Sequence, residues 1–145
     1  LQAGKKLTLV KVDKKTGEKV LISSRTYKVS KDGTVTADTK DAGAYVLLNE
    51  KDAKALSSKI LKSVALKDTK KTVANGKKAK VTFDKNLNME NVKKITYTSS
   101  KKSVVTVNKN GTIIAKKAGK AVVKVKVTLK NGKTKTVKMT IKVTK

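Results

Sequence analysis

The chain has 145 residues, with 37 Lys and Arg against 10 Asp and Glu, and a formal net charge of +27. It contains no Cys, His or Trp, which excludes disulfides, thiolate metal sites and catalysis by an imidazole base. No apolar run approaches the roughly 18 residues that a membrane-spanning helix needs, so we expect no membrane insertion in this segment. Because the chain begins with Leu1 rather than Met, we expect a mature segment or a piece of a longer protein.

The first part of the chain predicts strands joined by tight turns. Segments KLTLVKV at 6–12 and KVLISS at 19–24 flank a turn-like sequence at 14–17. A three-residue loop at 31–33, with a glycine in the left-handed conformation at its end, predicts a second hairpin. The cross-strand pairs expected for this second hairpin are Val29 with Val35 and Tyr27 with Ala37.

Residues 49–64 are the only helix-compatible window. Ala53, Leu56, Ile60 and Leu61 recur there at helical spacing, which predicts a short helix or turn joining the two halves of the chain. The chain has no proline, and no glycine-rich linker separates the halves, so we expect a close junction rather than a flexible tether.

The second half predicts two further hairpins, and side-chain parity selects their turns. In segments 121–129 and 135–143 the aliphatic residues share one parity and the lysines the other. A two-residue loop at 131–132 would pair apolar with polar positions, whereas a three-residue loop at 130–132 pairs like with like. A similar loop is predicted at 109–111. The expected pairs are Val125 with Val137, Val123 with Met139, Val107 with Ile113 and Val105 with Ala115.

Two segments of the chain are near twins. NKNGTIIAKKAG at 108–119 and SKDGTVTADTKDAG at 30–43 each follow a valine, and looser matches flank both copies at an offset that drifts between 72 and 78 residues. A fixed order with a drifting offset favours duplicated sandwich domains over a solenoid of constant period. We therefore predict an all-β fold of tandem antiparallel β-sandwiches, the first abbreviated, with domains at 1–58 and 59–145.

Four runs of the second half occur in an order and spacing that are typical of one family. They are Ile95-Thr96-Tyr97-Thr98-Ser99-Ser100, Ser103-Val104-Val105-Thr106-Val107, Asn110-Gly111-Thr112-Ile113-Ile114-Ala115 and Ala118-Gly119-Lys120-Ala121-Val122-Val123. Residues 64–145 closely resemble the bacterial immunoglobulin-like domains of group 2, modules of intimin- and invasin-type adhesins and other bacterial surface proteins. Residues 1–50 show a shortened, degenerate version. The resemblance implies Ig-like sandwiches whose shared residues are core and turn positions.

The positions that carry the repeat have structural interpretations. Glycine permits positive φ at a turn and a tight corner before a strand. The glycines to which we assign these roles are Gly33, Gly43, Gly111, Gly119 and Gly132. We expect Ala37 and Ala115 to let two sheets approach, and Tyr97 to be a core aromatic whose hydroxyl reaches a backbone group.

We expect no catalytic, cofactor-binding or metal-binding residue in this chain. The carboxylate pairs near predicted loops fit turn-capping roles; they are Asp32 with Asp38, Asp38 with Asp41, and Asp13 with Glu18. A Ca²⁺ site built from Asp32, Asp38 and Asp41 is the weaker alternative in so basic a chain. An intramolecular isopeptide bond between a buried lysine and an asparagine stays open.

The positive charge is concentrated after residue 62, where 23 lysines stand against 3 acids. On the last predicted hairpin Lys124 lies opposite Lys138, with Lys126 and Lys142 close by, and these four residues are the candidate polyanion-binding face. Three interpretations are open: a solvated face that blocks strand-to-strand aggregation, a contact for an anionic wall polymer or acidic glycan, and a contact for nucleic acid. Nucleic acid fits poorly, because one arginine, three Tyr and one Phe leave little base reading or stacking.

These observations favour a non-catalytic structural or adhesion module of a secreted or surface-attached bacterial protein. We expect a monomer that spaces or presents other domains and contacts an anionic envelope polymer, a glycan, or a host or bacterial surface protein. The alternatives are an accessory domain of a surface carbohydrate-active enzyme and a non-specific nucleic-acid binder.

Overall fold

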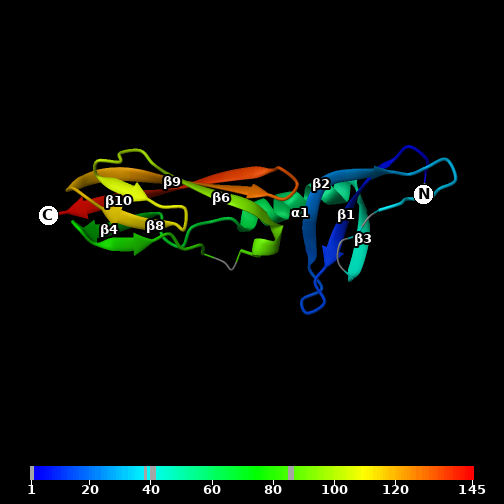
Figure 1. Cartoon of the computed structure of the whole chain (residues 1–145), viewed down its shortest axis with the longest axis horizontal. Coiled ribbons are helices and arrows are strands. Elements are labelled where there is room, and N and C mark those ends of the chain that lie inside the picture. Colours follow the sequence, from blue (N-terminus) through cyan, green and yellow to red (C-terminus); the bar gives the residue numbers. More distant parts are fainter. Residues whose placement is uncertain (1, 38, 40–41, 85–86) are drawn as a thin grey trace. The chain divides into compact units, whose positions relative to one another are not determined.

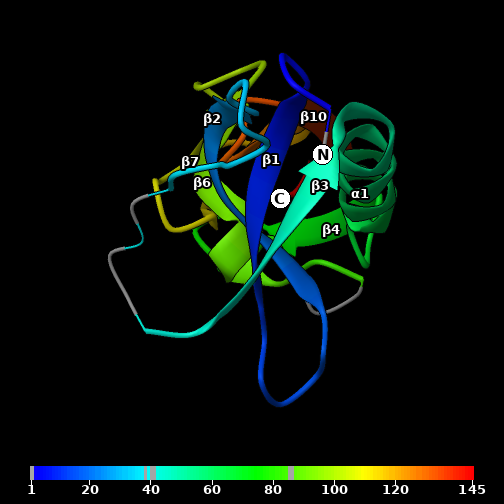
Figure 2. The same ribbon diagram turned by 90° about the vertical axis from the view of Figure 1, so that its right-hand side faces the viewer.

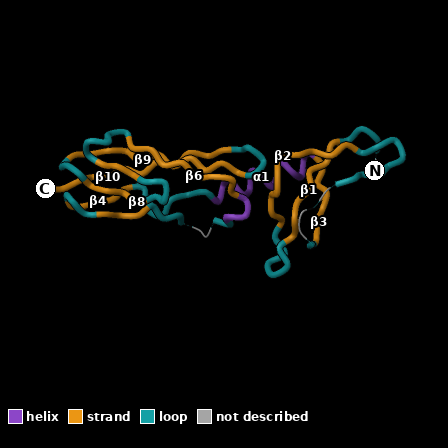
Figure 3. Tube along the Cα trace, in the orientation of Figure 1, coloured by secondary structure: helices purple, strands orange, loops and turns teal. Residues whose placement is uncertain are grey.

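The computed structural model describes residues 2–37, 39, 42–84 and 87–145. The described residues form ten β-strands, one α-helix and one short 3-10 helix (Figures 1 and 3). The chain is therefore mostly β, as the alternation of its residues predicted. It divides into two compact units: unit 1 contains residues 1–61, 89–93 and 129–133, and unit 2 contains residues 62–88, 94–128 and 134–145.

Unit 1 contains one three-stranded antiparallel sheet in the order β2-β1-β3. Its strands are β1 Lys6–Val12, β2 Lys19–Lys28 and β3 Ala44–Asn49. Figure 2 shows β1 between the two others, with the helix α1 beside β3. Val10 of β1, Leu21 of β2 and Leu48 of β3 are all buried, so the sheet contributes its own hydrophobic core.

The turn predicted at 14–17 is confirmed as the β1–β2 hairpin. The amide of Asp13 donates to the carbonyl of Glu18 at 2.8 Å, and the amide of Gly17 donates to the carbonyl of Asp13 at 2.8 Å. Gly17 has a φ of +70°, a conformation in which a β-carbon would be strained. The local sequence therefore sets this hairpin directly.

The turn predicted at 31–33 is also confirmed, but the strand pairing predicted beyond it is wrong. Gly33 has a φ of +81°, and its amide donates to the carbonyl of Ser30 at 3.0 Å. Residues 34–37 form no strand, and Tyr27 pairs with Leu7 instead of Ala37. The amide and carbonyl of Val29 both bond to residues 4 and 5. A residue in an antiparallel ladder directs its amide and its carbonyl to the same side. Val29 therefore has no backbone hydrogen-bonding group left to pair with Val35.

The predicted helix is confirmed as α1 Glu50–Ser63. Asn49 caps its first turn, because its Oδ1 accepts from the amide of Asp52 at 2.8 Å and its Nδ2 donates to Oδ2 of Asp52 at 2.9 Å. Acidic residues in the first turn and Lys62 in the last turn complement the helix dipole. Ile60 and Ser57 are the buried residues of α1.

Two segments from later in the chain complete unit 1 through side-chain hydrogen bonds. The 3-10 helix η1 Met89–Asn91 brings Oδ1 of Asn91 to 2.9 Å from the amide of Leu21, which donates to it. Nδ2 of Asn131 donates to Oγ of Ser57 at 2.6 Å, and that hydroxyl donates to the carbonyl of Ala53 at 3.0 Å. Asn91 and Ser57 are both buried, so these bonds satisfy polar groups that water does not reach.

Unit 2 contains two sheets, and the residues between them form an aliphatic core. The strand orders are β4-β10-β9-β6 and β5-β8-β7. Two such sheets are what a β-sandwich requires. The strands are β4 Lys70–Ala74, β5 Lys78–Lys80, β6 Val92–Ser99, β7 Val105–Val107, β8 Thr112–Ala115, β9 Gly119–Leu129 and β10 Thr134–Thr144. Val123, Val125 and Ile141 from the first sheet, with Val105 and Ile113 from the second, are fully buried.

The registers predicted for the two hairpins of unit 2 are confirmed. β9 pairs with β10 so that Val125 faces Val137 and Val123 faces Met139, and β7 pairs with β8 so that Val105 faces Ala115 and Val107 faces Ile113. Gly132 and Gly111 end the two three-residue loops with φ values of +86° and +79°. Parity and turn chemistry together are enough to fix such local pairings.

The expectation of a first sandwich is not confirmed. The described strands of unit 1 form one sheet accompanied by a helix, whereas those of unit 2 form two sheets. The near twins at 30–43 and 108–119 share the three-residue turn, with Gly33 and Gly111 in equivalent conformations. The second turn leads directly into β8, which pairs with β7, whereas residues 34–37 after the first turn form no strand.

Candidate functional site

The outer face of the sheet β4-β10-β9-β6 gathers exposed lysines from all four strands. In β9, Ala121, Val123, Val125 and Val127 are buried, so the residues of opposite parity point outward. We call the exposed outward lysines of this sheet the lysine face; they are Lys70, Lys94, Lys120, Lys124, Lys126, Lys138 and Lys142. Period-two alternation thus produces the aliphatic core and the charged surface from the same strands.

The register between β9 and β10 places lysines of this face directly opposite each other. Lys124 pairs with Lys138, and Lys120 pairs with Lys142. The parallel pairing of β4 with β10 places Lys70 beside Thr140, so the charge extends onto a third strand. Paired positions on neighbouring strands lie about 5 Å apart at the backbone, which concentrates positive potential on the sheet.

Threonines occupy most of the remaining outward positions. Those that lie on the same side of β4, β6 and β10 and are exposed are Thr72, Thr96, Thr98, Thr134, Thr136, Thr140 and Thr144. The half-buried Val122 lies opposite Thr140. No strand of this sheet contains Asp or Glu. The face therefore offers ammonium and hydroxyl donors to an anion, with no carboxylate in these strands to repel it.

The structure brings the four lysines predicted from sequence onto this one face. Lys124, Lys126, Lys138 and Lys142 are all exposed and lie on two adjacent strands. Sequence reasoning missed three further members. Lys120 shares the parity of Lys124, and this signal was available in the sequence; Lys70 and Lys94 needed the strand order.

Tyr97 and Gly111 form a close contact inside unit 2. A β-carbon added to Gly111 would lie 2.9 Å from Cζ and 3.0 Å from the hydroxyl oxygen of Tyr97. Tyr97 is half-buried, and burial raises the pKa of its hydroxyl. Gly111 therefore serves the turn by its positive φ and also leaves room for the aromatic ring, which supports the assignment of both residues to packing.

The remaining glycines of the predicted set lie at corners and turns. Gly119 has a φ of +149°, and a β-carbon there would lie 3.3 Å from Cγ2 of Val104. Gly43 directly precedes β3, and a β-carbon there would lie 3.3 Å from Cε of Lys11. A β-carbon at Gly132 would meet no atom within 4 Å. Glycine is therefore favoured there only by the backbone conformation.

Two of the carboxylates expected to cap turns, Asp13 and Asp32, do so. Asp13 Oδ1 accepts from the amides of Lys15 and Thr16 at 2.8 and 3.0 Å, and these bonds lower the pKa of its carboxyl. Oδ1 of Asp32 accepts from the hydroxyl of Ser30 and from the hydroxyl and amide of Thr34. The Ser30 bond is the largest cause that lowers the Asp32 pKa, from 3.8 to about 2. Both carboxylates are thus occupied by their own turns.

The other carboxylates considered for a Ca²⁺ site, Asp38 and Asp41, lie outside the described residues. Within the described ranges, no group of three or more His, Cys, Asp or Glu side chains is placed to hold a metal ion. None of the helices in that part of the chain is long and apolar enough to span a membrane.

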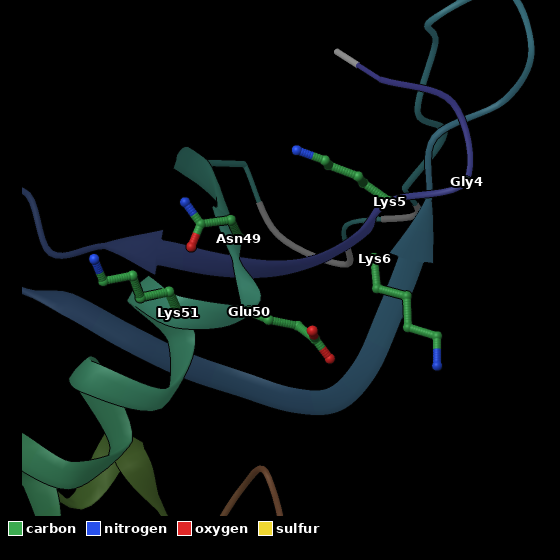
Figure 4. A pocket seen from close by; sticks show the side chains of 6 residues that line it. All are labelled: Gly4, Lys5, Lys6, Asn49, Glu50 and Lys51. Carbon is green, nitrogen blue, oxygen red and sulfur yellow. The ribbon is translucent and has the colours of Figure 1, made fainter.

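Unit 1 also has an open depression. It is lined by Gly4, Lys5, Lys6, Asn49, Glu50 and Lys51. Figure 4 shows the ammonium groups of Lys5, Lys6 and Lys51 pointing in different directions. The start of α1 at this depression is already capped by Asn49. The lining groups do not converge on one point as a binding pocket requires, so the lysine face is the stronger candidate.

A family model described as bacterial Ig-like domain (group 2) matches residues 60–144. The search of curated proteins found no match. Among similar solved structures, domains 4 and 5 of the S-layer protein SbsC share 14% sequence identity at a TM-score of 0.42, over 96% of this chain and 98% of that one. Two longer SbsC structures share 16% identity at TM-scores of 0.44 and 0.42, over 99% and 98% of this chain, which spans 28% of each.

Proposed function

The chain belongs to the bacterial Ig-like domain (group 2) family through residues 60–144, and from that premise we propose that it is a non-catalytic structural module of a bacterial cell-surface or secreted protein. In this role unit 2 spaces or presents other domains of the parent protein, and the lysine face holds it against anionic polymers or glycans of the cell envelope.

The observation that carries the envelope contact is the arrangement of Lys120, Lys124, Lys138 and Lys142 as two like-charged pairs on one exposed sheet face. Directly opposite like charges weaken a sheet. An anionic polymer laid on this face would neutralise both pairs at once, and it would gain affinity from the counterions that it releases.

The composition and packing support a structural role over a catalytic one. The chain has no His or Cys, the residues most often used as general base and as thiol nucleophile. The described acids Asp13 and Asp32 are bonded within their own turns. In unit 2 the strands pack Val, Ile and Met side chains between two sheets, which favours a rigid module that bears or spaces its neighbours.

The test uses the whole chain and two charge-matched variants. The face variant carries Lys120→Thr, Lys124→Thr, Lys138→Thr and Lys142→Thr, with threonine chosen because it suits strands. The loop variant carries Lys101→Thr, Lys102→Thr, Lys116→Thr and Lys117→Thr, at exposed positions outside the strands of unit 2. Each variant removes the same number of charges, so non-specific attraction falls equally in both.

Binding is measured by sedimentation with purified bacterial cell walls, before and after chemical removal of their anionic polymers, across a salt series. We expect the native chain and the loop variant to bind the untreated walls at low salt, with binding lost as salt rises and on stripped walls. We expect the face variant to bind weakly. Absence of binding at low salt, or equal binding to stripped walls, would reduce the module to a spacer.

A further inference from the structure

The charges of the lysine face follow a regular spacing along β9 and β10. Lys120 and Lys142 form one pair, Lys124 and Lys138 form the next, and Val122 with Thr140 separates them. With a rise of about 3.3 Å per residue, the two pairs lie ~13 Å apart along the strands, and Lys126 lies ~7 Å beyond Lys124. The charges therefore form a strip parallel to the strands, suited to an extended chain of anions.

The donor chemistry of this strip suits phosphate oxygens. Every charged group on it is a lysine ammonium, a compact charge with three donors that accepts phosphate oxygens from many directions. Arginine, whose planar fork matches carboxylate and phosphate alike with two parallel bonds, is absent from the four strands. Exposed threonines between the lysines, such as Thr136 and Thr140, add hydroxyl donors to the remaining phosphate oxygens.

The face also lacks a platform for stacking rings. Tyr97 is the only aromatic residue in the strands of this sheet, and its half-buried ring lies against Gly111, on the side of β6 opposite to the exposed Thr96 and Thr98. Single-stranded nucleic acids gain about 1–3 kcal/mol per base by stacking on aromatic side chains, and this face cannot supply that contribution. A polymer without bases loses nothing by the absence of such a ring.

We propose that the lysine face binds a linear, base-free phosphodiester polymer that lies along β9 and β10, with phosphates at the pairs Lys120–Lys142 and Lys124–Lys138. Lys126 and Lys70 extend the contact at its margins. This inference rests on the proposed function, because it names one class among the anionic envelope polymers. Each bound phosphate takes up a position between two ammonium groups that repel each other in the free protein, so binding also stabilises the fold.

The inference is tested by titrating the native chain, the face variant and the loop variant with three probes of matched length. The probes are poly(glycerol phosphate), polygalacturonate, which carries carboxylates, and oligo(dT), which carries bases on a phosphodiester backbone. Affinity is measured over a salt series by fluorescence anisotropy. We expect poly(glycerol phosphate) to bind the native chain and the loop variant more tightly than either other probe does at every salt concentration.

The salt dependence reports how many phosphates the face neutralises. Each neutralised phosphate contributes about 0.7 to the slope of log K against log salt for a single-stranded polymer, so loss of the two phosphates held at the lysine pairs should lower the slope by about 1.4 in the face variant. The loop variant should keep the native slope. Amide shifts of the native chain, mapped by NMR with poly(glycerol phosphate), should cluster at residues 120–126 and 138–142; this mapping stands even where the face variant is poorly folded.

The outcomes separate this inference from the proposed function. Equal affinity for polygalacturonate, lost in the face variant only, would overturn the phosphodiester assignment and leave the envelope contact in place. Tighter binding of oligo(dT) would overturn it in favour of nucleic acid. Three outcomes would overturn both the phosphodiester assignment and the envelope contact. They are an equal loss of affinity in the face and loop variants, amide shifts outside the lysine face, and no binding of any probe at low salt.

Discussion

Lys124 and Lys138 lie directly opposite each other on β9 and β10, and both side chains are exposed. Opposed like charges cost a few tenths of a kcal/mol to about 1 kcal/mol. The other side of the same strands buries Val123, Val125 and Met139 completely, and each fully buried side chain of this kind contributes about 1.5–3 kcal/mol. The hydrophobic term is the larger, so the sheet forms in spite of the repulsion between its lysines.

The first prediction concerns salt. We expect added NaCl to raise the free energy of unfolding, because at about 0.5 M it screens charges beyond a few ångströms. Lys138→Thr should raise that free energy at low salt by about 0.2–1 kcal/mol and reduce its rise with salt. Urea unfolding at low and high salt measures both effects, with Lys117→Thr in an exposed loop as the matched control. Loss of stability in Lys138→Thr at low salt would contradict the repulsion.

The second prediction separates backbone conformation from packing at two turn glycines. Gly111 and Gly132 have similar φ values, +79° and +86°, but only a β-carbon at Gly111 would meet the ring of Tyr97. Gly132→Ala should lower the free energy of unfolding by about 1–2 kcal/mol, the cost of a left-handed residue with a β-carbon. Gly111→Ala should lower it by about 1–3 kcal/mol more, the usual cost of overpacking. Denaturant unfolding measures both variants. Equal decreases in their free energies of unfolding would show that the ring of Tyr97 moves aside at no cost in free energy.

The third prediction concerns the buried amide of unit 1. Asn91 is 5% exposed, and its Oδ1 accepts from the amide of Leu21 at 2.9 Å. Asn91→Ala leaves a buried N–H group without this acceptor, so the free energy of unfolding should fall by about 1–3 kcal/mol. Hydrogen exchange at the amide of Leu21 should accelerate in the same variant. Asn110→Ala, at an exposed turn, should change stability by less than about 0.5 kcal/mol; a similar loss in both variants would contradict a specific role for Asn91.

The fourth prediction concerns acid. The hydroxyl of Ser30 and the groups of Thr34 lower the Asp32 pKa from 3.8 to about 2. As pH falls from above 3.8, the unfolded chain takes up a proton at this residue before the folded chain does. The contribution of Asp32 to stability is therefore present above pH 3.8 and is lost as pH falls through about 2. An NMR titration of the Asp32 carboxyl carbon should give a midpoint near that value, and Ser30→Ala should raise it.

If the midpoint in Ser30→Ala equals that of the native chain, the serine hydroxyl does not stabilise the carboxylate. Asp13 supplies an internal control, because its pKa is lowered mainly by the backbone amide of Thr16. We expect the midpoint of Asp13 to be unchanged in the Ser30 variant.

The sequence by itself determined the features that depend on neighbouring residues. Alternation assigned the buried and exposed sides of β9 and β10, and the glycine at the third loop position selected the register in which Val125 faces Val137. The helical spacing of Ala53, Leu56, Ile60 and Leu61 likewise predicted α1. These are local effects, because side-chain parity, turn conformation and helical periodicity act within a few residues.

Only the tertiary structure decided which strands meet. Tyr27 pairs with Leu7 rather than Ala37, β4 joins β10 in parallel, and this pairing adds Lys70 to a face of which sequence analysis found Lys124, Lys126, Lys138 and Lys142. Asn91 finds the amide of Leu21 across 70 positions. Side-chain parity shows which side of a strand is apolar, but it does not select the neighbouring strand. The choice among distant strands depends on the packing and backbone hydrogen bonds of the whole unit.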